Sequence, residues 1–108
     1  MKGSIIRMRI ISGKARGTKL YTLEGITTRP TLDRVKESLF NIIQTEITNS
    51  IFLDLFSGSG AIGLEAVSRG AKKSILCDKS KDAIGIIKKN ITKKRQCYRT
   101  VKYMLHFY

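Results

Sequence analysis

The stretch DLFSGSGAIG, residues 54–63, decides the fold of this chain. It begins near the end of a continuous apolar run, residues 51–56, which is typical of a strand buried on both faces of a parallel sheet. Three glycines, Gly58, Gly60 and Gly63, then give the spacing G-x-G-x-x-G at the start of a predicted short helix. Between a strand and a helix, this spacing predicts a tight turn that binds a nucleotide-like ligand at the helix N-terminus.

Each glycine has a separate expected role. Gly58 allows the tight turn, Gly60 lets the backbone approach a ligand closely, and Gly63 lets the helix pack on the strand. A second buried strand is predicted over residues 73–78 and ends at Asp78, twenty residues after Gly58. A carboxylate at that position can accept hydrogen bonds from both hydroxyls of a ribose. The alternative is that Asp78 only assists the start of the next helix.

Asp54 separates two classes of cofactor. A dinucleotide would place its pyrophosphate at this turn, where a strand carboxylate four residues before the first glycine would repel it. S-adenosylmethionine instead carries an ammonium and a sulfonium, which a carboxylate attracts. Ser57 and Ser59 add hydroxyl and backbone donors for the methionine carboxylate. Residues 54–60 therefore predict an S-adenosylmethionine turn, and a nicotinamide-dependent oxidoreductase becomes the weaker alternative.

A β-hairpin is predicted before this region. Residues 9–12 and 18–22 are expected to be its strands, and a glycine lies at each end of the turn between them. Lys14 and Arg16 make the tip basic. This tip could contact phosphates or be an ordinary solvated turn, and the sequence leaves both readings open.

Helices are predicted on both sides of the first strand. Thr31 is expected to be the N-cap of a helix that ends at about residues 45–48. Its core-facing stripe is expected to be Leu32, Val35, Leu39, Ile42 and Ile43. A short helix over residues 61–69 should stop at Gly70, and Ser80 should cap a third helix. Strand, helix, strand and helix in this order predict an α/β fold with a parallel sheet, to which residues 100–108 could add a strand.

The charge of the chain points to a polyanionic partner. Its 108 residues include 21 Lys and Arg against 8 Asp and Glu, a net charge of +13. Residues 88–102 hold seven basic side chains and no acidic one. Nucleic acid is the favoured partner, with a solvated helix face as the alternative. No apolar run is long enough to span a membrane, and two cysteines, Cys77 and Cys97, fit a reducing cytoplasm.

Three segments carry a resemblance to a known family. Residues 9–13 (RIISG), 29–42 (RPTLDRVKESLFNI) and 54–66 (DLFSGSGAIGLEA) strongly resemble the bacterial ribosomal RNA small subunit methyltransferase D family. The resemblance extends over roughly residues 8–94. It implies a partial Rossmann-like class I methyltransferase fold with an N-terminal hairpin and helix. It also implies transfer of a methyl group from S-adenosyl-L-methionine to N2 of a guanine in 16S rRNA.

The resemblance assigns cofactor contacts to the residues of the glycine turn. Asp54, Ser57, Gly58 and Gly60 would line the methionine end of the cofactor, and Asp78 would bind its ribose. Asp78 stands where family members often have Glu, and either carboxylate can serve.

The resemblance also assigns contacts to RNA. Arg29 and Arg34 are candidate contacts to the cofactor or to RNA, and the hairpin that carries Lys14 and Arg16 would help to hold RNA. The expected partner is 16S rRNA or a small-subunit assembly particle, the expected location is the cytoplasm, and the full-length family is expected to be monomeric.

The family's catalytic motif, Asp/Asn-Pro-Pro-Tyr/Phe, needs two consecutive prolines, and this chain has only Pro30. No catalytic residue is therefore predicted, and the chain alone is expected to be inactive, as a shortened form of the enzyme. The alternative is a non-catalytic basic RNA-binding fragment. A partial parallel sheet would also leave an edge and apolar faces exposed, which predicts marginal stability. The predicted divisions are an extension (1–7), a hairpin and linker (8–30), a partial cofactor-binding domain (31–95) and a divergent tail (96–108).

Overall fold

The computed structural model describes residues 4–23 and 29–106. Its strands are β1 (Ser4–Arg9), β2 (Lys19–Leu23), β3 (Ile51–Asp54), β4 (Lys73–Asp78) and β5 (Val101–Leu105). Its helices are α1 (Arg29–Ile47), α2 (Ala61–Ser68) and α3 (Lys81–Thr92). The order is that of an α/β fold in which a hairpin and a helix precede a strand–helix–strand–helix–strand unit, as the sequence predicts.

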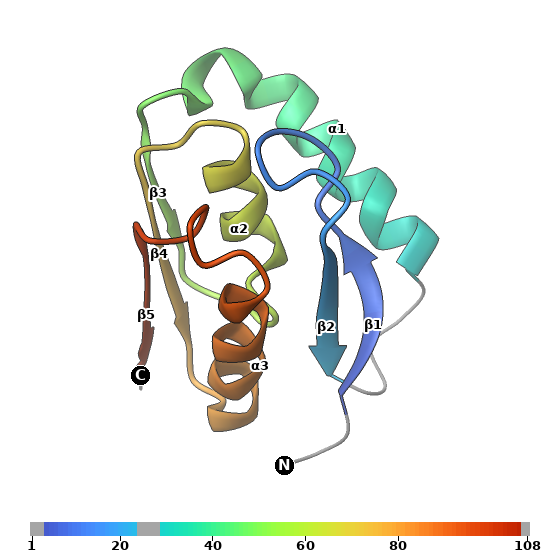
Figure 1. The fold of residues 1–108 in the computed structure, drawn as a ribbon, viewed down its shortest axis with the longest axis vertical. Helices are drawn as coiled ribbons and strands as arrows, with labels where there is room; N and C mark the ends of the chain where they lie inside the picture. The colour runs from blue at the N-terminus through green and yellow to red at the C-terminus, as the bar shows by residue number, and fades with distance from the viewer. Residues whose placement is uncertain (1–3, 24–28, 107–108) are drawn as a thin grey trace.

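The strands form two separate sheets. β1 and β2 pair as an antiparallel hairpin, whereas β3, β4 and β5 form a parallel sheet in that order. Figure 1 shows α2 and α3 between the parallel sheet and the hairpin, with α1 on the outer side of the hairpin. The predicted α/β fold with a parallel sheet and helices is confirmed.

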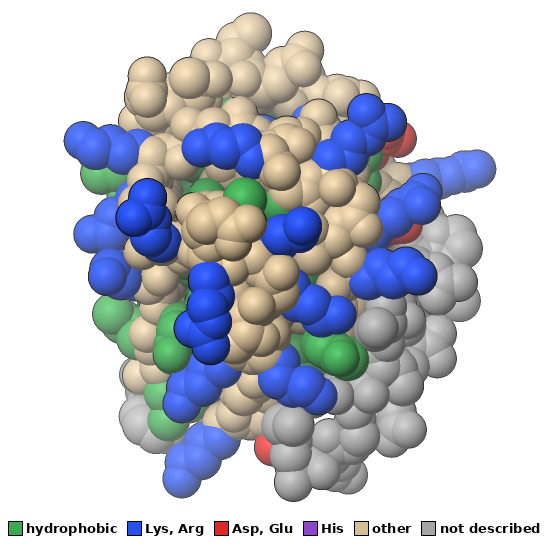
Figure 2. All heavy atoms as spheres, viewed as in Figure 1, with side chains coloured by type: hydrophobic (Ala, Val, Ile, Leu, Met, Phe, Trp, Pro, Cys, Tyr) green, Lys and Arg blue, Asp and Glu red, His purple; other side chains and the backbone are tan. Residues whose placement is uncertain are grey.

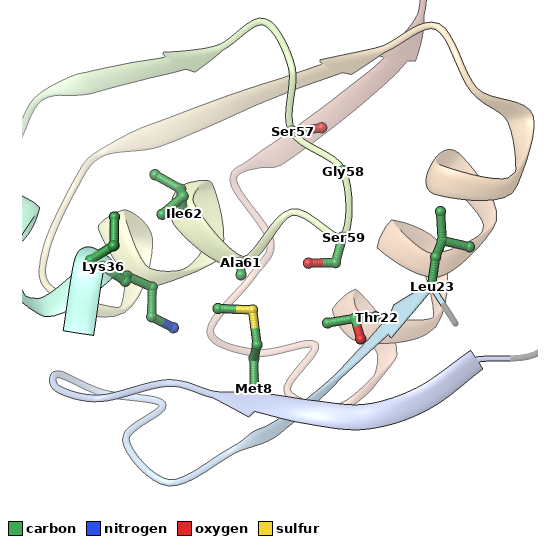
Figure 3. Close-up of a pocket in the computed structure, with 10 residues that line it drawn as sticks. Met8, Thr22, Leu23, Lys36, Ser57, Gly58, Ser59, Ala61 and Ile62 are labelled. Atoms are coloured by element: carbon green, nitrogen blue, oxygen red, sulfur yellow. The ribbon is translucent and has the colours of Figure 1, made fainter. Parts of the chain in front are cut away.

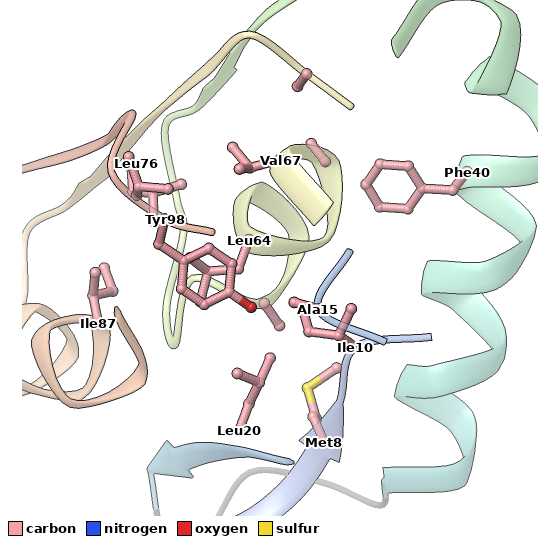
Figure 4. Packing of buried hydrophobic residues seen from close by; sticks show 14 of the residues in the cluster. Met8, Ile10, Ala15, Leu20, Phe40, Leu64, Val67, Leu76, Ile87 and Tyr98 are labelled. Carbon is pink, nitrogen blue, oxygen red and sulfur yellow. The ribbon is translucent and has the colours of Figure 1, made fainter. Parts of the chain in front are cut away.

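A mixed core fills the space between these layers. Figure 4 shows Leu20 from the hairpin, Leu64 from α2 and Tyr98 from the segment before β5 meeting at its centre. All three are at most 1% exposed. At about 25 cal/mol per Å² of apolar surface, burial of this kind is the main force that holds the hairpin against α2 and α3.

The third parallel strand, β5, lies inside the segment that was predicted only as a possible strand. Val101 pairs with Ser74 of β4, and the pairing continues to Leu105 opposite Asp78. Val101 is buried, whereas Lys102, Tyr103 and Met104 are exposed. β5 therefore joins the sheet as an edge strand that is largely open to solvent.

β3 corrects one expectation. The apolar run was predicted to be buried on both faces, but Ile51 is 65% and Leu53 is 56% exposed. Phe52 points the other way and stacks on Phe40 of α1, with 6.1 Å between the ring centres. The reason is that α2 and α3 lie on the same face of the sheet (Figure 1), and no other described element covers the opposite face.

The start of α1 also differs from the prediction. The helix begins at Arg29, two residues before the predicted N-cap Thr31. Pro30 therefore lies in the first turn, where its fixed φ suits a helix and its missing N–H has no partner to lose.

The buried face of α1 differs as well. Val35 is 59% and Ile42 is 78% exposed, although both belong to the predicted apolar stripe. The residues buried against the core are Lys36, Phe40 and Ile47. Ile43 of the predicted stripe is partly buried against the same core and Leu39 is half-buried, while the side chain of Leu32 lies outside the described residues. The stripe is rotated because Lys36 pairs with a buried carboxylate on α2, which no apolar periodicity could indicate.

The hairpin is shifted relative to its predicted strands. β1 ends at Arg9 rather than covering residues 9–12, and residues 4–7, predicted as an extension, belong to it. The N–H groups of Ile11 and Ser12 donate to the carboxylate of Glu65 on α2 instead of to β2. The loop therefore leaves the ladder and packs on α2.

The remaining elements agree with the sequence. α2 ends at Ser68 and is followed by Gly70 at φ 113°, and β4 has the predicted bounds. The side chain of Ser80 caps α3 by accepting a hydrogen bond from Ala83 N at 3.2 Å. Together these elements bring the ends of β3 and β4 to one edge of the sheet.

Candidate functional site

The glycine turn joins β3 to α2 at the carboxyl edge of the sheet. Gly58 and Gly60 have φ values of 54° and 83°, in the left-handed region that favours glycine. Gly60 N donates to Ser57 O at 2.8 Å, which closes the turn. The turn delivers the chain to the N-terminus of α2, as predicted.

The three glycines of the turn are needed for different reasons, which become clear when a Cβ atom is placed on each of them. At Gly63 it would lie 2.1 Å from Leu76 Cδ2, so Gly63 allows α2 to pack on β4, as predicted. At Gly60 it would lie 3.0 Å from Leu76 and 3.2 Å from Ile87, so that glycine also leaves room for core packing, and its approach to a ligand stays a prediction. At Gly58 it would meet nothing within 4 Å, so the open side of the turn is at Gly58.

Asp78 binds the turn. Its Oδ2 accepts from Gly58 N and its Oδ1 from Ser80 N, both at 2.9 Å. The carboxylate therefore joins the end of β4 to the glycine turn and to the start of α3. Each of its oxygens keeps a further acceptor site, so it can still accept hydrogen bonds from ligand hydroxyls.

Asp54 ends β3 beside the same turn. Its Oδ1 accepts from Phe56 N at 3.2 Å. Burial raises the pKa of Asp54, the hydrogen bond from Phe56 N works against this rise, and the negative charge of Asp78 adds to it. A carboxylate that is poorly solvated and close to a second carboxylate would be stabilised by a cationic ligand.

The two serines of the turn have different surroundings. Ser57 is buried, and both its N–H and its hydroxyl donate to Cys77 O, at 2.9 and 3.1 Å. It therefore fastens the turn to β4 in this conformation and offers no spare donor. Ser59 lines a cavity, and its carbonyl accepts from Asn90 Nδ2 at 3.0 Å.

That cavity, about 210 Å³ in volume, lies between the glycine turn and the hairpin. Figure 3 shows Met8 and Thr22 of the hairpin on one side and Ser59 and Ala61 on the other, with Lys36 at one end. The hydroxyl of Thr22 is buried and has no hydrogen-bond partner among the described residues. Thr22 therefore places an unpaired polar group beside a cavity whose lining is mostly apolar.

Asn90 is a site residue that the sequence analysis missed. Its Oδ1 accepts from Tyr21 N at 2.7 Å, and its Nδ2 donates to Tyr21 O and Ser59 O at 3.0 Å. It thus ties α3 to both walls of the cavity. The available signal was an amide three residues after Ile87, on the apolar face of α3.

Glu65 is a second such residue. It is fully buried, and its carboxylate lies 3.1 Å from Lys36 Nζ and 2.7 Å from Arg69 Nε, besides accepting from the N–H groups of Ile11 and Ser12. Burial lowers the pKa of Lys36, and the charge of Glu65 opposes this decrease. The network holds α1, α2 and the hairpin loop together, which fixes the outer wall of the cavity.

Three of the basic residues predicted to contact RNA, Lys14, Arg16 and Arg34, do not line the cavity. Lys14 and Arg16 are exposed on the hairpin loop, which is held to α2 by Lys14 N donating to Ser68 O at 2.8 Å. Arg34 is exposed on α1, next to the cavity-lining Val35. The side chain of Arg29 lies outside the described residues. None of the described helices is long and apolar enough to cross a membrane.

A protein-family model described as "Conserved hypothetical protein 95" matches residues 8–105. The chain belongs to this family. The match begins where the resemblance in the sequence begins and extends beyond Arg95 through β5. Residues 96–105, predicted as part of a divergent tail, are thus covered by the family model.

Curated members of similar sequence support the resemblance. Ribosomal RNA small subunit methyltransferase D of Haemophilus influenzae is 48% identical over 84 residues, which is 78% of this chain and 44% of that protein. The YlbH protein of Bacillus subtilis is 45% identical over 97 residues, 85% of this chain and 53% of that protein. The chain therefore spans about half the length of the curated relatives it matches, and the resemblance is confirmed for this N-terminal part.

Solved structures show the same fold. The Escherichia coli protein yhhF matches with a TM-score of 0.78 and 35% identity, over 94% of this chain and 52% of that one. The Thermus protein TTHA0928 matches with a TM-score of 0.74 and 31% identity, over 91% of this chain and 54% of that one.

Proposed function

We propose that this chain forms the cofactor-binding part of an S-adenosylmethionine-dependent methyltransferase that acts on N2 of a guanine in 16S rRNA. One observation carries the proposal: Asp54, the glycine turn and Asp78 meet at one edge of the parallel sheet, next to a cavity closed by the hairpin. A curated relative with this segment is named for methylation of small-subunit ribosomal RNA.

The residues of the turn suit the two ends of the cofactor. The Asp54 carboxylate, whose pKa burial raises, would attract the positively charged methionine end. The backbone at Gly58 is open to a ligand, and Ser59 would supply a hydroxyl in the cavity. Asp78 would accept hydrogen bonds from the ribose through the acceptor sites that Gly58 N and Ser80 N leave open.

When bound, the cofactor supplies the methyl group, and the chain's own residues bind and orient it. Lys36 and Glu65 neutralise each other beside the cavity, so they contribute its shape rather than a net charge. The 108 residues contain one proline and therefore no Pro-Pro motif to hold the target amine. We expect donor binding by this chain without turnover.

The first test is isothermal titration calorimetry of the chain with S-adenosylmethionine and, separately, with NAD. Heat of binding is expected for the methyl donor alone, because the pyrophosphate of NAD would meet Asp54. Binding of NAD in preference to S-adenosylmethionine would contradict the proposed cofactor.

The second test is a methyl-transfer assay on unmodified small ribosomal subunits. We expect no product with the 108-residue chain, and methylated guanine once the chain carries the second half of a family relative. A measurable rate with the chain alone would show that the missing motif is dispensable. A chain that binds RNA and no methyl donor would instead favour the alternative, a non-catalytic RNA-binding fragment.

A further inference from the structure

Lys89 of α3 and Lys93, which caps the C-terminus of that helix, lie over one aromatic ring of the hairpin. Lys89 Nζ is 4.2 Å and Lys93 Nζ is 4.5 Å from the centre of the Tyr21 ring. The lysines are four residues apart and so project from one side of α3. Attraction of an ammonium group to an aromatic ring contributes about 0.5–1 kcal/mol at an exposed site. The arrangement gathers two positive charges around one aromatic surface, which suits a negatively charged ligand.

Positive charge continues across α3 from the hairpin to the sheet. Lys19 shares a face of β2 with Tyr21, since the two are two residues apart on a strand. On the other side of α3, Lys88 Nζ lies 6.0 Å from the centre of the Tyr103 ring on β5. We call this set the basic band: Lys19, Tyr21, Lys88, Lys89, Lys93 and Tyr103.

Few acidic groups accompany this positive charge. Both ion pairs found among the described residues belong to Glu65, so Lys19, Lys88 and Lys93 have no carboxylate partner in that part of the chain. Figure 2, drawn from the side on which α3 faces the viewer in Figure 1, shows many Lys and Arg side chains and little acidic surface.

The basic band borders the candidate cofactor site. Asn90, next to Lys89 on α3, bonds to both backbone groups of Tyr21 and to Ser59 of the glycine turn. Thr22, the residue after Tyr21, lines the cavity. The backbone that holds the Tyr21 ring is thus one residue away from a wall of the cavity.

We propose that the basic band is a docking surface for the sugar-phosphate backbone of the RNA substrate, and that it places this RNA beside the methyl-donor site. The inference rests on the proposed function, which supplies RNA as the partner. Lysines bind phosphates with release of counterions, and tyrosine rings provide stacking surfaces for bases. The band includes Lys88, Lys89 and Lys93 of the basic run noted in the sequence, and it does not include Lys14 and Arg16 of the hairpin tip.

The test compares two double variants that lose the same charge. Lys89→Gln with Lys93→Gln removes the pair over Tyr21, and Lys72→Gln with Lys102→Gln removes two lysines at the amino ends of β4 and β5. Binding to a structured fragment of small-subunit rRNA is measured by filter binding at several salt concentrations. The first variant is expected to bind about tenfold more weakly, and its slope of log K against log salt to fall by about 1.4–1.8. The control should change affinity less than about threefold. Equal losses in both variants would overturn the inference.

Further variants exclude a purely structural role. Lys89→Arg with Lys93→Arg keeps both charges over the ring and is expected to retain RNA binding; binding as weak as that of the Gln variant would contradict the proposal. Thermal unfolding followed by circular dichroism verifies that each variant is folded. Vesicles of anionic phospholipid serve as a second polyanion, and binding to them with equal affinity and equal loss in the Gln variant would overturn the assignment to RNA.

Calorimetry with S-adenosylmethionine separates the two proposals. Donor binding that is unchanged in the Gln variant, together with loss of RNA binding, supports both. If the chain binds the methyl donor but its RNA binding does not depend on Lys89 and Lys93, the basic band alone is overturned. If the chain does not bind the methyl donor but its RNA binding does depend on these lysines, the proposed function alone is overturned.

Discussion

Glu65 connects three segments that are far apart in the sequence. Its carboxylate forms ion pairs with Lys36 of α1 and with Arg69, which follows α2. It also accepts hydrogen bonds from the N–H groups of Ile11 and Ser12 in the hairpin loop. A buried carboxylate is tolerated only when its charge is neutralised and its oxygens are hydrogen-bonded, and here both conditions hold. Together with the apolar core and Asn90, this side chain holds the hairpin in the position that closes the cavity.

Replacing Lys36 tests this network. Lys36→Met preserves most of the side-chain volume but leaves Glu65 with Arg69 as its only cationic partner, so we expect a loss of about 3 kcal/mol in the free energy of unfolding. Urea denaturation measures it. Lys14→Met, an exposed control on the hairpin loop, should change stability by less than about 0.5 kcal/mol. Equal effects of the two substitutions would show that the buried pair is not needed.

If the proposed function holds, Asp54 should make binding of the methyl donor depend on pH. Burial raises its pKa above the value in the unfolded chain, so protonated Asp54 favours folding and this contribution is lost as pH rises through the raised pKa. A cationic ligand requires the ionised form, so donor affinity should fall as pH falls through the same pKa. Calorimetric titration with S-adenosylmethionine from neutral to mildly acidic pH measures the change. Affinity that stays constant over this range, or rises toward acid pH, would argue against contact between Asp54 and the cation.

At the scale of elements, the packing of α2 on β4 sets the position of the glycine turn. Gly63 lies inside α2, where alanine would ordinarily favour the helix by about 1 kcal/mol. Because a Cβ there would lie 2.1 Å from Leu76 Cδ2, we expect Gly63→Ala to destabilise the chain by about 1–3 kcal/mol instead. Thermal unfolding measures the sign. In a Leu76→Val background the loss of stability caused by Gly63→Ala should be smaller. An unchanged loss would show that it does not come from contact with Leu76.

The elements differ in how far the sequence predicts them. The bounds of β4 and the caps of α2 and α3 follow from local signals: Asp78 ending an apolar run, Gly70 after a helix and Ser80 before one. The cofactor turn was predicted as a cluster, and the structure brings Asp54 and Asp78 to the same edge. Whether these residues bind the cofactor stays a prediction.

Long-range contacts explain what the sequence did not predict. The buried face of α1 differs from the predicted one because Lys36 pairs with Glu65, 29 residues later in the chain. β1 ends early because the N–H groups that follow it donate to α2. The role of Asn90 likewise depends on strands and turns far from it in the sequence. Such contacts have no periodic signature in a single chain.

At the scale of the whole molecule, the parallel sheet is covered on one face only. Apolar side chains that are 49–71% exposed lie along its open face and carboxyl edge: Ile51, Leu53, Leu55, Phe56 and Met104. β3 and β5 are both edge strands, with backbone groups able to pair with another chain. This agrees with the predicted partial sheet, in a chain that spans about half the length of its curated relatives.

The open face should cause self-association. We expect the chain to bind a hydrophobic dye and to sediment in a concentration-dependent way, because large apolar patches drive association. The double variant Ile51→Thr with Leu53→Thr places hydroxyl groups on the open face while keeping residues that favour a strand. It should reduce both dye binding and concentration-dependent sedimentation. Ile42→Thr is the control, since Ile42 is 78% exposed on α1, away from the sheet. A chain that is monomeric at high concentration, or a control as effective as the sheet variant, would contradict this account.

The most direct test of the account is the affinity of the Asp54→Asn variant for S-adenosylmethionine, measured by calorimetry beside the unaltered chain and an Asp82→Asn control on α3. A unit charge about 4 Å from a cation near a protein surface contributes up to about 4 kcal/mol. We therefore predict that Asp54→Asn weakens binding at least about tenfold, equivalent to about 1.4 kcal/mol, while the control leaves it unchanged. Equal affinities for all three proteins would contradict the claim that this carboxylate holds the methyl donor.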